Sequence, residues 1–248
     1  MLTSDKGFTL VELLIAMAIV GIVLTGMYEL FVTSNTIYLA QNAIVEMQAD
    51  SRAAMDFMVR ELRLTCNKLP PACTPPTIFT TTATNDTISF DRVEETGYSS
   101  GGNSATTLND TKKSWLSGDF APSASSSYMI RIIGGTGKDQ VRSISSNSPT
   151  QTTVTLAWGT TPDSTSIYVI TSTKQFTRTS TSDNVLRYRI GAAGVQNPLA
   201  ENILNHSFSR PSPNTIGITL TGQTRAPDPI TKQYRTYTLT EEVTIRNK

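Results

Sequence analysis

The chain has 248 residues and a formal net charge of +1, so its overall charge supports neither a nucleic-acid role nor a membrane-surface role. Aromatic residues make up only 7% of the chain, while Thr and Ser are abundant after its first quarter. This composition favours exposed β-structure outside the cytoplasm over a large enzyme core.

The segment from Gly7 to Tyr28 is an apolar run, GFTLVELLIAMAIVGIVLTGMY. A helix of about 20 apolar residues crosses the hydrocarbon core of a bilayer. The run carries one charge, Glu12, and a carboxylate in a membrane helix costs roughly 2.5–3.5 kcal/mol on insertion scales. Two roles fit this carboxylate: a charged partner from another subunit, or a cap on the first helical turn, where the helix dipole favours negative charge.

A continuous helix is predicted over residues 8–64, because no Pro interrupts this stretch. Beyond the membrane its apolar residues recur at helical spacing, as Leu30/Phe31, Ile37/Tyr38, Ile44/Val45, Met55, Met58/Val59 and Leu62. We expect this amphipathic half to pack on the β-rich remainder of the chain.

Two cysteines, Cys66 and Cys73, follow in the Pro-containing segment CNKLPPAC, which ends the helix. In an oxidising compartment they would form a short-loop disulfide worth about 2–3 kcal/mol. Two free thiols, or half of a metal site, are the alternatives. A four-ligand zinc site needs more Cys or His than a chain with one His offers. Residues 87–93 then alternate like a strand, and residues 97–104 form a Gly/Ser-rich stretch expected to be flexible.

Residues 105–170 contain short predicted strands separated by Gly, Asn, Pro and Asp. They resemble a small β-module of phage structural proteins and bacterial surface proteins, which implies an inserted unit for display or contact. The resemblance rests on Leu108, Asp110, Ser114, Trp115, Arg131, Ile132, Gly134, Gly137, Asn147, Trp158 and Tyr168. Trp115 and Trp158 are expected to be buried rather than to form a ligand platform.

Longer strands return after residue 170, in 174–179, 185–190, 203–209, 215–222 and 234–247. In the last of these, Tyr237, Leu239, Val243 and Ile245 share one face by the period of two. A sheet with one apolar face is what the amphipathic half of the helix requires. The return of the sheet is the reason for treating residues 105–170 as an insertion.

The sequence offers no enzyme constellation, metal site or cofactor motif. His206 is the only histidine, and no nucleophile or orienting carboxylate accompanies it in a recognisable motif. The stretch GGTGKD lacks the spacing of a phosphate-binding loop, and no EF-hand-like loop appears. Residues 174–248 hold ten Lys and Arg against five Asp and Glu, an excess too small to argue for nucleic-acid binding. We therefore expect no catalysis.

A short polar leader ending in Gly7, followed by Phe-Thr-Leu-Val-Glu and an apolar run, resembles the type III signal of type IV pilins and pseudopilins. The helix end Arg-Glu-Leu-Arg-Leu (60–64) and the closing Val-Thr-Ile-Arg-Asn (243–247) resemble PilW-like minor pilins. The helix end is also similar to that of J-type pseudopilins of type II secretion. The fold implied is α+β: a long N-terminal helix on an antiparallel β-sheet head with an inserted all-β module.

The resemblance also implies a sequence of events. A prepilin peptidase would cut between Gly7 and Phe8 and methylate the new Phe8 amine, and Glu12 would then pair with the N-terminal ammonium of a neighbouring subunit. The chain would be held in the inner membrane with its head in the periplasm, and later join other major and minor pilins at the cell surface. The alternatives are a J-type pseudopilin and a membrane-tethered adhesin or enzyme.

The predicted domains are the leader (1–7), the helix (8–64, with 8–28 transmembrane), the sheet head (65–104 and 171–248) and the inserted module (105–170).

Overall fold

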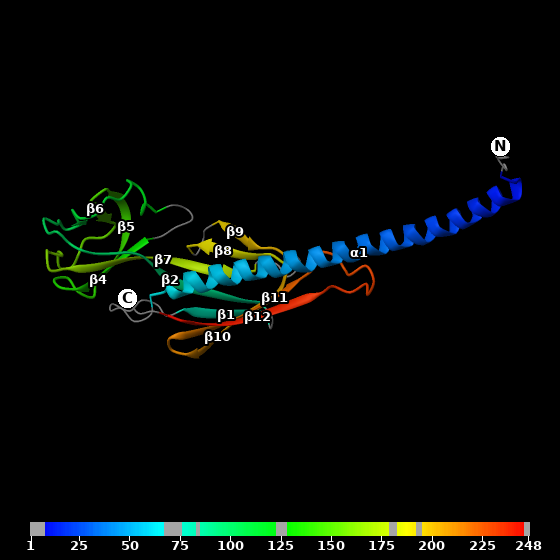
Figure 1. The fold of residues 1–248 in the computed structure, drawn as a ribbon. Helices are drawn as coiled ribbons and strands as arrows, with labels where there is room; N and C mark the ends of the chain where they lie inside the picture. Colours follow the sequence, from blue (N-terminus) through cyan, green and yellow to red (C-terminus); the bar gives the residue numbers. More distant parts are fainter. Residues whose placement is uncertain are drawn as a thin grey trace, which may run out of the picture. The chain divides into compact units, whose positions relative to one another are not determined.

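The computed structural model describes residues 8–66, 76–82, 85–122, 128–178, 183–191 and 195–245, which form one α-helix and twelve β-strands (Figure 1). In chain order these are α1 (Leu10–Arg63), β1 (Thr77–Thr82), β2 (Asn85–Tyr98), β3 (Thr107–Asn109), β4 (Tyr128–Gly134), β5 (Val141–Ser148), β6 (Gln151–Val154), β7 (Ile167–Thr177), β8 (Leu186–Ile190), β9 (Gln196–Ala200), β10 (Ile203–Ser212), β11 (Thr215–Gln223) and β12 (Thr236–Thr244).

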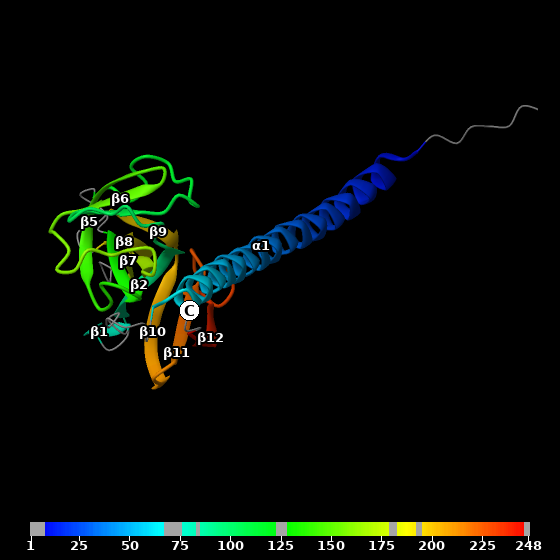
Figure 2. The same cartoon turned by 90° about the vertical axis from the view of Figure 1, so that its left-hand side faces the viewer.

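The strands follow the order β12-β11-β10-β2-β7-β4-β5-β6-β3, with β1 on β2, β8 on β7 and β9 on β8. Neighbours are antiparallel except β10 and β2. Figure 2 shows β10, β11 and β12 side by side. The β5–β6 and β6–β3 pairs make a small second sheet. The α+β class predicted from the sequence is confirmed.

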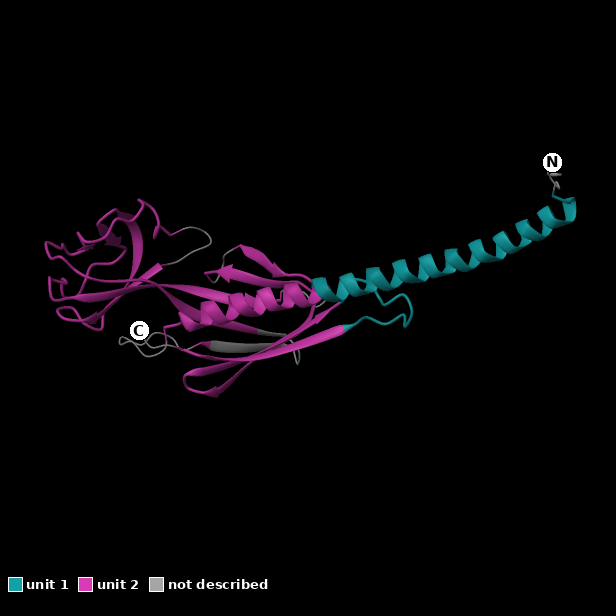
Figure 3. Cartoon of the chain, in the orientation of Figure 1, with its two compact units in different colours: residues 1–46, 224–235 teal, residues 47–223, 236–248 magenta. Residues whose placement is uncertain are grey.

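The chain divides into two compact units (Figure 3). One contains Met1–Glu46 and Thr224–Arg235, and the other contains Met47–Gln223 and Thr236–Lys248. Helix α1 therefore contributes its first part to one unit and its last part to the other. The sheet, except for the 224–235 loop between β11 and β12, belongs to the second unit.

In the second unit the last part of α1 packs on the sheet. The helical stripe predicted from the sequence is confirmed in its last part, because Met55, Met58, Val59 and Leu62 are buried. Its first part was wrongly expected to pack in the same way: the side chains of Leu30, Phe31, Ile37, Tyr38 and Val45 are exposed. The buried residues form the first core with apolar residues of β2, β7, β8, β10, β11 and β12. The period of two in β12 and the residue after it is also confirmed: Val243 and Ile245 are buried, and Tyr237 and Leu239 are half-buried. Burial of this stripe is what fixes the helix on the sheet.

Gly222, in β11, allows a close approach between the helix and the sheet. A Cβ atom at this position would lie 2.4 Å from Ser51 Oγ and 3.3 Å from Met47 Cγ. Ser51 is itself buried on α1. A larger residue at 222 would therefore force the serine hydroxyl or the helix to move.

We expect Gly222→Ala to lower the free energy of unfolding by about 1–3 kcal/mol, the usual cost of overpacking. Thermal unfolding of the full chain in detergent, followed by circular dichroism, measures this. The matched control is Gly222→Ala in a Ser51→Ala background, where the clashing oxygen is absent and the cost should shrink. An equal cost in both backgrounds would contradict the proposed contact.

A second, separate core lies at the far end of β2 and β7. Leu108, Trp115, Trp158, Tyr168 and other apolar residues of 108–170 form it. The expected burial of both tryptophans is confirmed, and the Trp115 ring packs edge-on against Phe120 with centroids 5.4 Å apart. Strands β2 and β7 run continuously from the first core to the second.

Strand β2 is longer than predicted. A strand was expected at 87–93 and a flexible stretch from 97, whereas β2 extends to Tyr98, which pairs with Ile167 of β7. The pairing with β7 overrides the low strand propensity of Gly97. The predicted insertion boundary at 170/171 lies inside β7, and the insertion itself stays a prediction.

Tyr168 donates a hydrogen bond of 2.7 Å to Asp110 Oδ2 within the second core. Burial, and then this bond to a carboxylate, raise the pKa of the Tyr168 hydroxyl well above its ordinary value of 10.0. In the unfolded chain the same hydroxyl loses its proton near pH 10. The unfolded state therefore binds fewer protons than the folded state above that pH.

We expect stability to fall as pH rises above 10, with Tyr168 alone contributing about 1.4 kcal/mol per pH unit. Unfolding free energies from denaturant titrations between pH 9 and 11 measure the slope. Tyr168→Phe cannot ionise, so its slope should be shallower than that of the native chain. Parallel slopes would show that Tyr168 is not the group responsible.

Candidate assembly and processing site

The start of α1 is closed by a reciprocal pair of hydrogen bonds between Thr9 and Glu12. The Glu12 carboxylate accepts from Thr9 N at 2.9 Å and from Thr9 Oγ1 at 3.0 Å, while Glu12 N donates to Thr9 Oγ1 at 3.3 Å. With Thr9 before the first helical residue, Leu10, this is a capping box of the Thr-x-x-Glu type. It explains why the helix begins at Leu10. The capping role weighed for Glu12 is therefore confirmed, and its inter-subunit role stays a prediction.

Phe8, which follows the predicted cleavage point, lies at the tip of this helix. Phe8 is 89% exposed and directly precedes the capping residue Thr9. Gly7 and the rest of the leader lie outside the described residues. The bond that a peptidase would cut therefore adjoins an exposed residue and a helix with a defined start.

After the cap, α1 presents an apolar surface that nothing in the described residues covers. It passes the length and composition test for a membrane-crossing helix, and its most apolar 18-residue window is entirely exposed. The hydroxyl of Thr25 is satisfied inside the helix, donating to Gly21 O at 2.8 Å. The exposed surface of this segment is therefore almost entirely apolar. Such a surface is suited to contact with lipid or with another apolar helix.

The predicted cysteines and the single histidine fall within the residue ranges of the second unit. Cys66, just after α1, is disulfide-bonded, and Cys73 lies outside the described residues. His206 is buried in β10 beside Phe208, with ring centroids 5.7 Å apart. Among the described residues no group of three or more His, Cys, Asp or Glu could hold a metal ion.

A charge cluster, called the buried charge cluster below, was not predicted from the sequence. It joins two buried residues, Glu61 of α1 and Lys174 of β7, to the half-buried Arg92 and Glu94 of β2. Arg92 Nε lies 3.0 Å from Glu61 Oε2 and also pairs with Glu94. Lys174 Nζ lies 3.1 Å from Glu94 Oε1, and Tyr188 donates to Glu61 at 3.0 Å. Burial, reinforced by Glu61, raises the pKa of Tyr188, so this hydroxyl stays a donor. The cluster ties the end of the helix to three strands.

The buried charge cluster lies between the two cores along β7. Alternate residues of a strand share a face, and on this face Phe176 belongs to the first core while Ile170 and Tyr168 belong to the second. Lys174 and Ser172 stand between them, both contacting Glu94. Acidic and basic residues in a polar strand are typical of a solvated face, so the sequence carried no signal of their burial.

A comparison with protein families finds a match over residues 2–28 to the model of the prokaryotic N-terminal methylation motif. No curated protein and no solved structure matches the chain. The motif implies processing by a prepilin peptidase and assembly with other pilins. It falls on the exposed apolar start of a long helix whose last part packs on a curled antiparallel sheet. The N-terminal segment is thus a prokaryotic N-terminal methylation motif, the signal of type IV prepilins, on a chain of type IV pilin-like architecture.

Proposed function

We propose that the chain is a minor type IV pilin of the PilW-like kind, which takes part in pilus initiation or tip assembly. Prepilin peptidase cuts between Gly7 and Phe8 and methylates the Phe8 amine. The apolar helix holds the subunit in the inner membrane, with the head in the periplasm, until it enters the filament. The head has no catalytic role. The match of residues 2–28 to the methylation motif is the observation that carries this proposal.

In the filament, Glu12 pairs with the methylated N-terminal amine of a neighbouring subunit. Among the residues that the structure describes, its carboxylate accepts hydrogen bonds from Thr9 alone, and Thr9 is exposed. A second partner that carries positive charge would offset the cost of a carboxylate in an apolar surrounding. The capping box holds the carboxylate close to the new chain end.

Mass spectrometry of the protein isolated from its membrane tests the processing step. We expect a mature chain that starts at Phe8 and carries one added methyl group, and a Gly7→Ala variant that keeps Met1 and loses both changes. An intact Met1 in the native protein would instead indicate a simple membrane anchor, as in a tethered adhesin.

The phenotype of a deletion strain separates the two machines that use this signal. Loss of pili and of twitching motility supports the minor pilin. Loss of secreted enzymes with normal pili would identify a J-type pseudopilin of type II secretion.

A further inference from the structure

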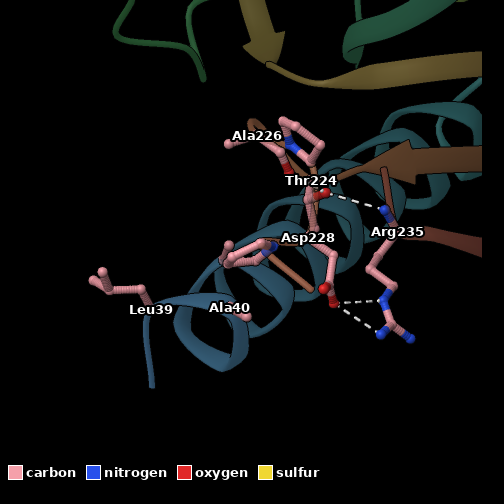
Figure 4. A pocket seen from close by; sticks show the side chains of 9 residues that line it. Leu39, Ala40, Thr224, Ala226, Asp228 and Arg235 are labelled. Carbon is pink, nitrogen blue, oxygen red and sulfur yellow. Dashed lines mark hydrogen bonds and ion pairs between the residues drawn. The ribbon is translucent and has the colours of Figure 1, made fainter. Parts of the chain in front are cut away.

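The loop of residues 224–235, between β11 and β12, is held in one conformation by its own hydrogen bonds (Figure 4). Thr224 N donates to Arg235 O at 2.9 Å, and Arg235 N donates to Thr224 Oγ1 at 3.1 Å. Asp228 is at the centre: its carboxylate accepts from Ile230 N and Thr231 N at 2.8 and 2.9 Å. It also accepts from Arg235 Nε and Nη2 at 3.0 and 2.8 Å. The loop is thus built without help from a ligand.

These contacts also fix the charge of the loop. The backbone donor of Thr231, then the Arg235 side chain and the backbone donor of Ile230, lower the pKa of Asp228 to about 2. Asp228 therefore stays ionised, and paired with Arg235, at any physiological pH. Both carboxylate oxygens of Asp228, and Nε and Nη2 of Arg235, are occupied inside the loop.

Between this loop and the helix lies an open pocket of about 240 Å³. Leu39, Ala40 and Ala43 of α1 form one side, and Ala226, Pro227 and Pro229 of the loop form the other. Figure 4 shows the labelled Leu39 and Ala40 on the helix and the paired Asp228 and Arg235 on the loop. Leu39 remains 57% exposed. A preformed pocket lined in this way accepts an apolar side chain.

The position of the pocket along the helix determines whether a lipid chain or a protein side chain can occupy it. An apolar span that begins at Phe8 leaves the hydrocarbon core near Tyr28, after about 30 Å. Leu39 follows eleven residues later, about 16 Å further along an upright helix, and it lies about 14 Å above the core at the average tilt of about 20°. The headgroup layer is only about 5–8 Å deep. Acyl chains therefore do not reach the pocket.

We propose that this pocket receives an apolar side chain from the N-terminal helix of a neighbouring pilin subunit in the filament. The inference rests on the proposed function, since only assembly brings such a helix out of the membrane. Subunits that are staggered along a filament place the apolar part of one helix beside the post-membrane part of another. The pocket adjoins the exposed apolar surface of α1, so one partner helix covers both.

A photoreactive benzophenone residue at position 39, in assembled filaments, tests the occupant directly. We expect crosslinks to the apolar N-terminal helix of a neighbouring pilin, identified by mass spectrometry of the joined peptides. Crosslinks to lipid, to a pilin head domain or only within the same chain would overturn the inference, and so would the absence of any crosslink.

Filling the pocket is the second test. Ala43→Phe should reduce incorporation into filaments roughly tenfold, the effect of losing one buried apolar side chain at an interface. Ala53→Phe, at an exposed alanine of the same helix, is the matched control and should incorporate normally. Equal incorporation of the two variants would overturn the inference.

The failure of the proposed function and the failure of the pocket inference give different results. If Phe8 is not the mature N-terminus, the proposed function fails. If processing and incorporation are normal but position 39 crosslinks elsewhere, only the pocket inference fails.

Discussion

Replacing Glu94 by leucine should lower the free energy of unfolding by about 3–5 kcal/mol, the usual cost of breaking a buried ion pair. Glu94 lies in the buried charge cluster and contacts both Arg92 and Lys174. Lys174 is only 4% exposed, so without Glu94 its ammonium loses its ion-pair partner in a poorly solvated position. Arg92 keeps Glu61 and is less affected. Denaturant unfolding of the full chain in detergent gives the value.

A second substitution separates the lost pair from a simple packing defect. Glu94→Leu combined with Lys174→Met replaces the pair by apolar residues, and such replacements are often neutral or even stabilising. We expect the double variant to recover most of the loss, with a coupling energy of about 2 kcal/mol or more. Additive effects of the two substitutions would show that the pair is not coupled.

The second large effect is expected for filament assembly, where Glu12→Gln should reduce incorporation roughly tenfold or more, since each 1.4 kcal/mol lost is a factor of ten. Glutamine still closes a capping box, because its side-chain oxygen accepts from the backbone of Thr9. The substitution therefore removes the charge and leaves the cap. The amount of the subunit in sheared pili, compared with the amount in the membrane, measures assembly.

Thr9→Ala is the complementary variant. It removes the Thr9 hydroxyl from the cap, at a cost of about 1 kcal/mol at the helix terminus, and keeps the Glu12 charge. We expect near-normal assembly. The reverse pattern, with Thr9→Ala deficient and Glu12→Gln normal, would show that Glu12 serves the helix start and not a neighbouring subunit.

The helix and the outer strands could be predicted from the sequence because each follows one clear period. The stripe of Met55, Met58 and Leu62 repeats at helical spacing, and β12 alternates from Tyr237 to Ile245. These patterns record burial on one face, which local sequence shows directly. A cap by Glu12 was weighed from its place in the first helical turn, whereas its partner Thr9 is identified only by the structure.

The buried charge cluster and the 224–235 loop could not be predicted in this way. Arg92, Glu94 and Lys174 come from two strands far apart in sequence, and only the β2–β7 register brings them together. The Pro-rich loop was readable as a break between strands. Its pocket, however, depends on the bonds of Asp228 and on the small residues Ala40 and Ala43 of the helix. Both features depend on long-range pairing, which no local period encodes.

The separation of the two cores has a consequence for how this protein can evolve. The residues that hold α1 and those that surround Trp115 belong to different clusters, with charged and hydroxyl side chains between them on β7. A substitution in the distal cluster therefore leaves the packing of the helix untouched. Substitutions can accumulate around Trp115 while the residues that hold α1 on the sheet remain under their own packing constraints.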